Sequence, residues 1–372
     1  MHIFFLVSNL SEAGGTQRVV VNLANEFIKQ DNVTIINVGK QNGDIKFQLN
    51  KNIQTIFLNN DKFEINKKNK LKKIIQSIKY IFKIKTQINS IIKSNKSDNI
   101  IIAMGMLFSY VLVFLKDENL IKIGSQHNPF YGGKIINYFR KKIINKLDYF
   151  VVLNEDMKKN TTEKLNIKNC ITIENPISFY PKAPSRLQNK KLLSIGRLYN
   201  QKGYDMLIEI WSILINRGYN DYTLIIVGDG PEELELKQKV SKYGIDDNLK
   251  FISSTKEIEK YYLESDIYLM SSRHEGMPMV LLEAQSWGLP IVSFDCPTGP
   301  QIIIENGKNG FLIPCFNKVD FANKIEELLI NDQLRYFMGK EARKSVKKYE
   351  INNVANKWRS LFDEGMKRKN DE

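Results

Sequence analysis

Short apolar runs alternate with segments of helical period along the whole chain, and no other feature constrains the fold as strongly. In the first half, the segment from Thr16 to Lys29 repeats its apolar residues at helical spacing between two such runs. Five runs are candidate strands: 3–7, 33–38, 101–105, 121–125 and 149–153. Near-continuous apolar strands suit a parallel sheet that helices cover on both faces. The first half therefore predicts a doubly wound α/β domain.

The same alternation begins again after residues 174–190, which contain three prolines and predict a linker without regular structure. Four more candidate strands follow this linker: 192–196, 223–228, 267–270 and 291–294. A pair of helices, roughly 318–348 and 350–368, is expected after them. A chain of 372 residues is long enough for two such cores. The predicted domains are 1–178 and 179–350. A C-terminal helix is expected in 351–372, and two positions are open for it: beside the second domain, or back against the first.

Ligands of doubly wound folds bind beyond the carboxyl ends of the strands, so polar residues in the loops that follow strands are the candidate ligand-binding residues. The first such loop carries Gly14, Gly15 and Thr16 and opens a helix. Glycine lets the backbone approach a ligand, and a helix N-terminus presents N–H groups to an anion. A glycine pair before a helix is by itself more often only a tight turn, and the pattern is not GxGxxG.

The second loop holds Gly196, Arg197 and Lys202, after the first strand of the second domain. Two cations there would neutralise the charge that builds up on a departing diphosphate. On these residues alone, ordinary solvated surface cations explain the pattern equally well.

The third loop carries two carboxylates, Glu275 and Glu283, which lie eight residues apart. Pro278 suits the first turn of a helix, which would aim the nearby amides at a ligand and set Glu283 about one turn inside. One carboxylate would meet sugar hydroxyls and the other a ribose. A solvated glutamate pair on an amphipathic helix would leave the glycine and proline between them unexplained. The candidate ligand-binding residues of this loop are Glu275, Gly276, Met277, Pro278, Met279, Val280 and Glu283.

Together the E-x7-E pair, the GRL…QKG segment and the GGTQR loop resemble glycosyltransferase family 4, and the likeness covers nearly the whole chain. The resemblance implies an α/β protein of the GT-B fold, with two Rossmann-like domains facing across a cleft. It also implies retaining transfer of a hexose or N-acetylhexosamine from a nucleotide diphosphate sugar, a UDP-sugar by preference. The loop at 295–302 is similar to relatives that act on polysaccharides and lipid-linked oligosaccharides.

The resemblance further implies a role for each residue. Arg197 and Lys202 would hold the donor diphosphate, Glu275 would meet the donor sugar, Glu283 would bind the ribose, and His127 matches the histidine beside the donor sugar. No cofactor is expected, and no metal either, because the chain contains no D-x-D triplet. Alanine at Arg197 or Glu283 is expected to abolish turnover without harming the fold.

The charge distribution points to an anionic partner. The net charge is +14, and residues 1–180 hold 27 basic against 14 acidic residues. Lys62–Lys96 contains eleven lysines and one acidic residue, and Lys134–Lys146 contains five cations and no acidic residue. These runs predict an anionic membrane surface as partner, and the protein would lie in the cytoplasm at the inner face of the membrane. No stretch reaches the roughly 20 apolar residues that span a bilayer.

The first basic run also contains apolar residues at helical spacing, and these fit either an interfacial helix or a core-facing helix with a solvated lysine face. They are Leu71, Ile74, Ile75, Ile78 and Phe82. Two other functions remain open on the sequence. An epimerase or phosphorylase of the same fold would share Arg197 and Glu283. A nucleic-acid-binding protein would share the basic charge, but we expect no nucleic acid, because the lysines are not interleaved with aromatic platforms.

Overall fold

The computed structural model describes residues 1–12, 14–40, 44–60, 70–93, 98–117, 119–127, 134–297 and 299–371. It divides into two compact units, of which the first comprises Met1–Ser178 together with Ile351–Glu372 and the second comprises Phe179–Glu350. Each unit has its own sheet and its own buried core, and each is described by itself below.

The first unit is built on a seven-stranded parallel sheet. In spatial order its strands are β3 (Gln54–Asn60), β2 (Asn32–Gly39), β1 (His2–Val7), β4 (Asn99–Met104), β5 (Leu120–Gln126), β6 (Tyr149–Val152) and β7 (Cys170–Thr172). Every residue of β1, β4 and β6 is buried, which is why these strands read as unbroken apolar runs.

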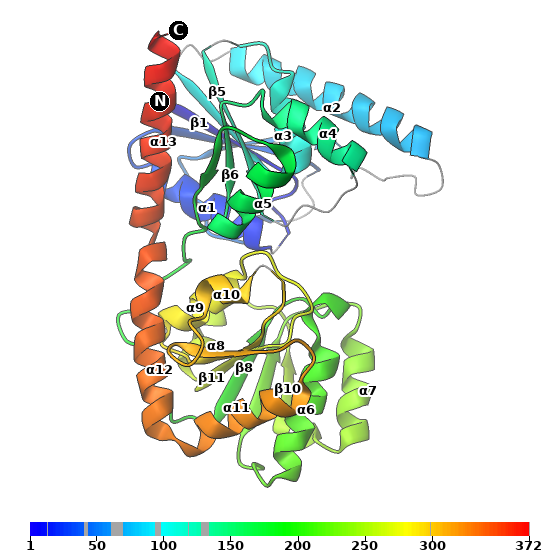
Figure 1. Ribbon diagram of the computed structural model, residues 1–372, viewed down its shortest axis with the longest axis vertical. Coiled ribbons are helices and arrows are strands. Elements are labelled where there is room, and N and C mark those ends of the chain that lie inside the picture. The colour runs from blue at the N-terminus through cyan, green and yellow to red at the C-terminus, as the bar shows by residue number, and fades with distance from the viewer. Residues whose placement is uncertain are drawn as a thin grey trace. The chain divides into compact units, whose positions relative to one another are not determined.

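The described residues of this unit also form α1 (Gly15–Phe27), α2 (Lys70–Lys93), α3 (Met106–Val113), α4 (Lys134–Ile144), α5 (Glu155–Leu165) and α13 (Ile351–Asp371). Helices α2, α3, α4 and α5 each contact the next, whereas α13 contacts α1 and β5 (Figure 1). The fully buried Phe362 of α13 meets Phe27 of α1 edge to face, with ring centroids 5.5 Å apart. An ion pair of 2.7 Å between Arg359 and Asp31 also ties α13 to this unit.

The second unit is built on a six-stranded parallel sheet. In spatial order its strands are β10 (Leu249–Ile252), β9 (Thr223–Val227), β8 (Lys191–Ile195), β11 (Ile267–Met270), β12 (Ile291–Phe294) and β13 (Gly310–Ile313). Its core includes Trp211, Phe294 and Phe321, all fully buried.

The helices of the second unit are α6 (Tyr204–Asn216), α7 (Glu233–Tyr243), α8 (Ile258–Leu263), α9 (Met279–Ser286), α10 (Pro300–Ile303), α11 (Lys318–Ile330) and α12 (Asp332–Ser345). Short 3₁₀ turns accompany them at η1 (Asn200–Lys202), η2 (Asp246–Asn248) and η3 (Val346–Tyr349). The prediction of one helix over 318–348 is wrong. Asn331 leaves the helical region and its side chain caps α12 by accepting a bond from the Leu334 amide, so two helices form.

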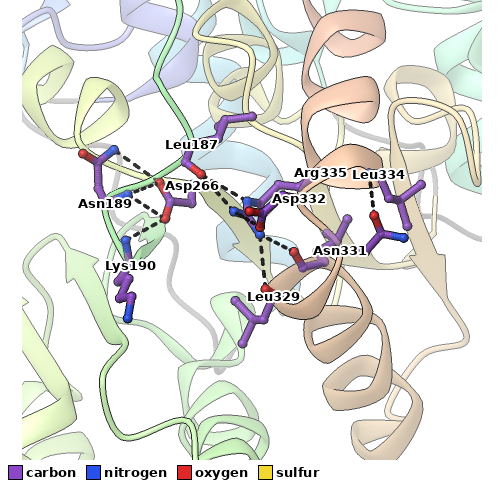
Figure 2. A network of polar contacts seen from close by, with 10 residues as sticks. Leu187, Asn189, Lys190, Asp266, Leu329, Asn331, Asp332, Leu334 and Arg335 are labelled. Atoms are coloured by element: carbon purple, nitrogen blue, oxygen red, sulfur yellow. Dashed lines mark hydrogen bonds and ion pairs between the residues drawn. The ribbon is translucent and has the colours of Figure 1, made fainter.

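A buried network holds the segment that leads into β8 (Figure 2). The carboxylate of Asp266 accepts bonds from the backbone amides of Asn189 and Lys190, at 2.7–2.9 Å. The guanidinium of Arg335, which is 6% exposed, donates to the carbonyls of Leu187 and of Leu328 at the end of α11. The segment has no helix or strand, as predicted, but these bonds fix the start of the central strand of the second sheet.

The prediction of two doubly wound parallel sheets is confirmed, and all nine candidate strands are present. The strands that the sequence did not reveal are β3, β7, β10 and β13, the outer strands of the two described sheets. Only part of each is buried, and β3, β7 and β10 include polar or charged residues. None of the described helices is both long enough and apolar enough to span a bilayer.

Helix α2 leaves exposed two of the apolar residues that the sequence placed at helical spacing, Ile78 and Phe82. Ile78 and Phe82 are 48% and 47% exposed, so a core-facing position for them is wrong. The buried stripe instead runs along Ile84, Ile88 and Ile92, which lie one turn apart. The side chains of Leu71, Ile74 and Ile75, and all of residues 62–69 and 94–96, lie outside the part of the chain that the structure describes.

Candidate functional site

The strand order of the second sheet identifies where its ligand site should lie. The chain passes from β8 outward to β9 and β10, and then returns to the other side of β8 with β11, β12 and β13. The order thus reverses between β8 and β11, and open parallel sheets bind ligands beyond the strand ends at such a point. The loop after β8 carries Gly196, Arg197 and Lys202, and the loop after β11 carries Glu275.

These two loops meet through an ion pair of candidate residues. The Lys202 Nζ lies 2.7 Å from Oε1 of Glu275, and the Ser272 hydroxyl donates to the same oxygen at 2.8 Å. The two side chains are only 17% and 10% exposed, so the pair is largely shielded from water. A cation and a carboxylate from different strands are therefore set side by side at the reversal of the sheet.

Arg197 differs from Lys202 in its environment. Its side chain is exposed, and its guanidinium lies over the ring of Tyr199, 5.2 Å from the centroid. Within the described residues no carboxylate is paired with it. Gly196 makes room in this loop, because a Cβ at this position would lie 2.9 Å from the Tyr204 hydroxyl and 3.0 Å from Cε of Lys202.

The loop after β11 leads into α9, whose N-terminus is not capped by a side chain. Its first amides are thus of the kind that bind anions. Pro278 has extended ψ and precedes the helix by one residue, so its predicted place inside the first turn is corrected. Gly276, Met277 and Met279 are buried, and Val280 is half-buried.

Glu283 is more deeply buried than the sequence suggested. It is 1% exposed on α9, and its Oε2 accepts a bond of 2.8 Å from the Tyr262 hydroxyl, itself fully buried. Glu283 therefore belongs to the packed interior, so the prediction that alanine here spares the fold stands against its burial. Tyr262 stacks near Tyr268, whose hydroxyl bonds both the amide and the carbonyl of Ile195 at the end of β8.

Sequence reasoning missed the loop after β9, which packs directly on the Arg197 loop. A Cβ at Gly228 would lie 1.9 Å from the Gly196 carbonyl, and one at Gly230 would lie 2.2 Å from the Leu198 carbonyl. The backbone also bonds across this contact, from the Leu198 amide to the Asp229 carbonyl. Two glycines directly after an apolar run were the available signal.

The remaining candidates belong to the first unit. Its strand order reverses between β1 and β4. Gly14 lies in the loop after β1, and Gly15 and Thr16 open α1 at this reversal. Gly14 precedes α1 without a side-chain cap, and a Cβ there would lie 2.4 Å from Oε1 of Gln17.

His127 directly follows β5, and its Nε2 lies 3.2 Å from the Ser125 hydroxyl. Part of the side chain remains accessible, but the protein packed around it disfavours the charged ring and lowers the pKa of His127 to about 4. The imidazole is consequently neutral at physiological pH. One of its ring nitrogens donates a hydrogen bond and the other accepts one, but the ring supplies no positive charge. Among the described residues, no three His, Cys, Asp or Glu side chains gather where they would hold a metal ion.

Comparison with known proteins agrees with these observations. The model of the family described as glycosyl transferases group 1 matches residues 179–345. An uncharacterised glycosyltransferase of Haemophilus influenzae is 32% identical over 365 residues, covering 97% of this chain and 99% of its own length. A Campylobacter jejuni enzyme is 24% identical over 98% of this chain and 99% of its own, and its name describes transfer of N-acetylgalactosamine to a diphospho-undecaprenol-linked sugar.

Solved structures share the fold. A crystal structure of a mutant of S. aureus TarM, in complex with fondaparinux, alpha-GlcNAc-glycerol and UDP, superimposes with a TM-score of 0.82. The match covers 97% of this chain and 99% of that one at 19% sequence identity. The two doubly wound units are thus those of the GT-B fold, and the chain belongs to the group 1 glycosyl transferases.

Proposed function

We propose that the protein is a retaining glycosyltransferase of the family 4 type, which moves a hexose or N-acetylhexosamine from a UDP-sugar to a lipid-linked or polysaccharide acceptor without a metal ion. The names of its relatives support the reaction, and the bound UDP in the TarM structure supports the nucleotide. In this proposal the unit 179–350 binds the donor and the unit containing 1–178 binds the acceptor.

The observation that carries the proposal is the pairing of Lys202 with Glu275 where the strand order of the second sheet reverses. The donor diphosphate would lie against Lys202 and the exposed Arg197, and the α9 N-terminus would add amide donors. Glu275 would then accept bonds from donor-sugar hydroxyls, and Glu283 would bind the ribose. Gly14, Gly15 and Thr16 would let the first unit's backbone approach the donor.

The step that these groups serve is charge separation. The bond between the anomeric carbon and the diphosphate oxygen breaks, the acceptor oxygen bonds the same carbon from the same face, and the acceptor proton passes to the departing diphosphate. Lys202 and Arg197 stabilise the charge that builds on the leaving group, and this stabilisation is worth most where water is excluded. His127, neutral at physiological pH, would hydrogen-bond the donor sugar.

We further propose that the protein works at the inner face of the cell membrane, with α2 and α4 toward anionic lipid. These helices contain eleven cations and no acidic residue, and α3, which touches both, carries no charge. On α2 the exposed Lys79 and Lys83 adjoin the exposed Ile78 and Phe82. Cations beside exposed apolar side chains suit a lipid head-group region.

The reaction is tested with a panel of nucleotide sugars and measurement of nucleoside diphosphate release, with and without lipid-linked acceptor. We expect release from a UDP-sugar that persists in a chelator, and an acceptor product that keeps the anomeric configuration. An epimerised sugar nucleotide or a sugar phosphate as product would contradict the proposal. Arg197→Ala is expected to reduce release on the order of a hundredfold, because one cation at the leaving group is lost.

The membrane proposal is tested by sedimentation with vesicles of phosphatidylglycerol and phosphatidylcholine. Lys79→Glu with Lys83→Glu should weaken binding by more than about tenfold, since each lysine near anionic lipid contributes about 1 kcal/mol. Phe82→Ser should weaken binding with little change in its salt dependence. Leu234→Ser is the matched control, because Leu234 is 71% exposed on the second unit. Equal binding by all variants, or equal binding to neutral vesicles, would contradict the proposal.

A further inference from the structure

Two loops must keep a fixed relation if Lys202 and Glu275 are to act together. Lys202 ends η1 in the loop after β8, and Glu275 lies in the loop after β11. The backbone ladder between these strands pairs Ile267 with Leu192 and Tyr268 with Leu193, which lie before the loops begin. Other contacts therefore have to hold the loops together.

An arginine–aspartate pair joins the loop after β8 to the loop after β11. The guanidinium of Arg273 contacts both carboxylate oxygens of Asp205, NH1 to Oδ1 at 2.9 Å and NH2 to Oδ2 at 2.7 Å. NH1 also donates to the Asn200 carbonyl at 2.6 Å. Such a planar bidentate pair fixes orientation as well as distance. Burial raises the pKa of Asp205, but the bond and charge of Arg273 outweigh it and hold this pKa below its usual value.

Close contacts and hydrogen bonds of the backbone also join these two loops. Gly203 adopts a φ of +67°, and a Cβ there would lie 2.2 Å from the Ser271 carbonyl. The Ser271 hydroxyl donates to the Lys202 carbonyl at 3.0 Å, and the Arg273 amide donates to the Gln201 carbonyl at 2.8 Å. The residues that flank Lys202 and precede Glu275 are thus bonded to each other.

From this arrangement we propose that the Asp205–Arg273 pair is a positioning clamp that holds Lys202 against Glu275 in the geometry that donor transfer needs. Asp205 lies three residues beyond Lys202 on the first turn of α6, and Arg273 lies two residues before Glu275. Neither clamp residue needs to touch substrate. The inference rests on the proposed function of Lys202 and Glu275, and it adds residues that act only through them.

The clamp is expected to affect kcat through the distance between Lys202 and Glu275. Displacement of a catalytic group by about 1 Å costs on the order of a hundredfold in rate. Asp205→Asn and Arg273→Gln are each expected to lower kcat by about 10- to 100-fold. The double variant should lose no more than the worse single variant, because either change opens the same clamp. Arg273→Lys, which keeps the charge but not the fork, should recover part of the loss.

Arg217 and Glu326 provide a matched control. Their ion pair of 2.6 Å joins α6 to α11 in the same unit, each side chain is 30% exposed, and neither lies in the donor loops. For comparison, Arg273 and Asp205 are 25% and 35% exposed. Arg217→Gln and Glu326→Gln should lower the melting temperature about as much as the clamp variants do, yet keep kcat within about twofold of wild type.

The experiment measures nucleoside diphosphate release for all variants at a temperature below every melting transition, together with hydrogen exchange of the Lys202 and Arg273 amides. Slow turnover and fast exchange in the clamp variants only would support the proposal. Clamp variants as active as the control variants, or double-variant losses that multiply, would overturn it. If wild type releases no nucleotide from any donor, the proposed function fails instead. Exchange then decides on the clamp alone, since unchanged protection in Asp205→Asn would overturn it.

Discussion

Lys202→Met removes one charge from the candidate site and little volume, and its effect can be worked from the contacts of the pair. In the native protein Oε1 of Glu275 accepts hydrogen bonds from both the Lys202 ammonium and the Ser272 hydroxyl. Methionine keeps the apolar length of the side chain but cannot donate. The variant therefore removes the Lys202 cation from Glu275 and keeps the bond from the Ser272 hydroxyl.

The contacts of the pair give an expected loss of folding stability and an expected loss of kcat. A carboxylate that is 10% exposed and loses its cation destabilises the fold by about 1–2 kcal/mol, the lower part of the range for an under-bonded buried group. In a unit of this size that lowers the melting temperature by about 2–8 °C. Loss of one preorganised cation at the leaving group lowers kcat by about 10²–10³-fold, or about 3–4 kcal/mol. The effect on catalysis should exceed the effect on stability.

The measurements are nucleoside diphosphate release, UDP binding by calorimetry and thermal unfolding. Lys239→Met is the control, since Lys239 is 25% exposed and pairs with Glu209 elsewhere in the same unit. The double variant Lys202→Met, Glu275→Gln should recover most of the stability, because it removes both charges of the ion pair together, but none of the turnover. A single variant with kcat within threefold of wild type, or a double variant with restored turnover, would refute the reasoning.

Three further predictions follow from burial and hydrogen bonding. Tyr262→Phe removes a buried bond to the Glu283 carboxylate, so the donor KM should rise by about 10-fold or more with kcat nearly unchanged, and a loss in kcat alone would contradict ribose binding by Glu283. Phe362→Ala should destabilise the first unit by about 3–5 kcal/mol and leave the second unit's melting transition in place, as followed by calorimetry with limited proteolysis. His127 has a folded-state pKa of about 4, below its unfolded value, so the unfolded state binds more protons and stability declines as pH falls from about 6.5 toward 4. His127→Gln should flatten that decline in thermal unfolding, and an unchanged pH profile would contradict the burial argument.

The sequence alone determined the class of the fold and the loops that matter. Strands such as β6 and β11 are buried along their whole length, so each is apolar throughout and is visible without a structure. The glycines and charges directly after β8 and β11 mark ligand loops, because strand ends are where a parallel sheet exposes side chains to ligands.

The tertiary structure decided what depends on partners distant in sequence. Lys202 meets Glu275 across 73 residues, and Arg273 reaches Asp205 across 68, distances that no local pattern encodes. On α2, Ile78 and Ile84 are equally apolar, and only the packing of the helix leaves the first exposed and buries the second. The outer strand β10 is only partly buried, so its sequence needs no unbroken apolar run. It is recognised as a strand only because it pairs with β9 in the folded protein.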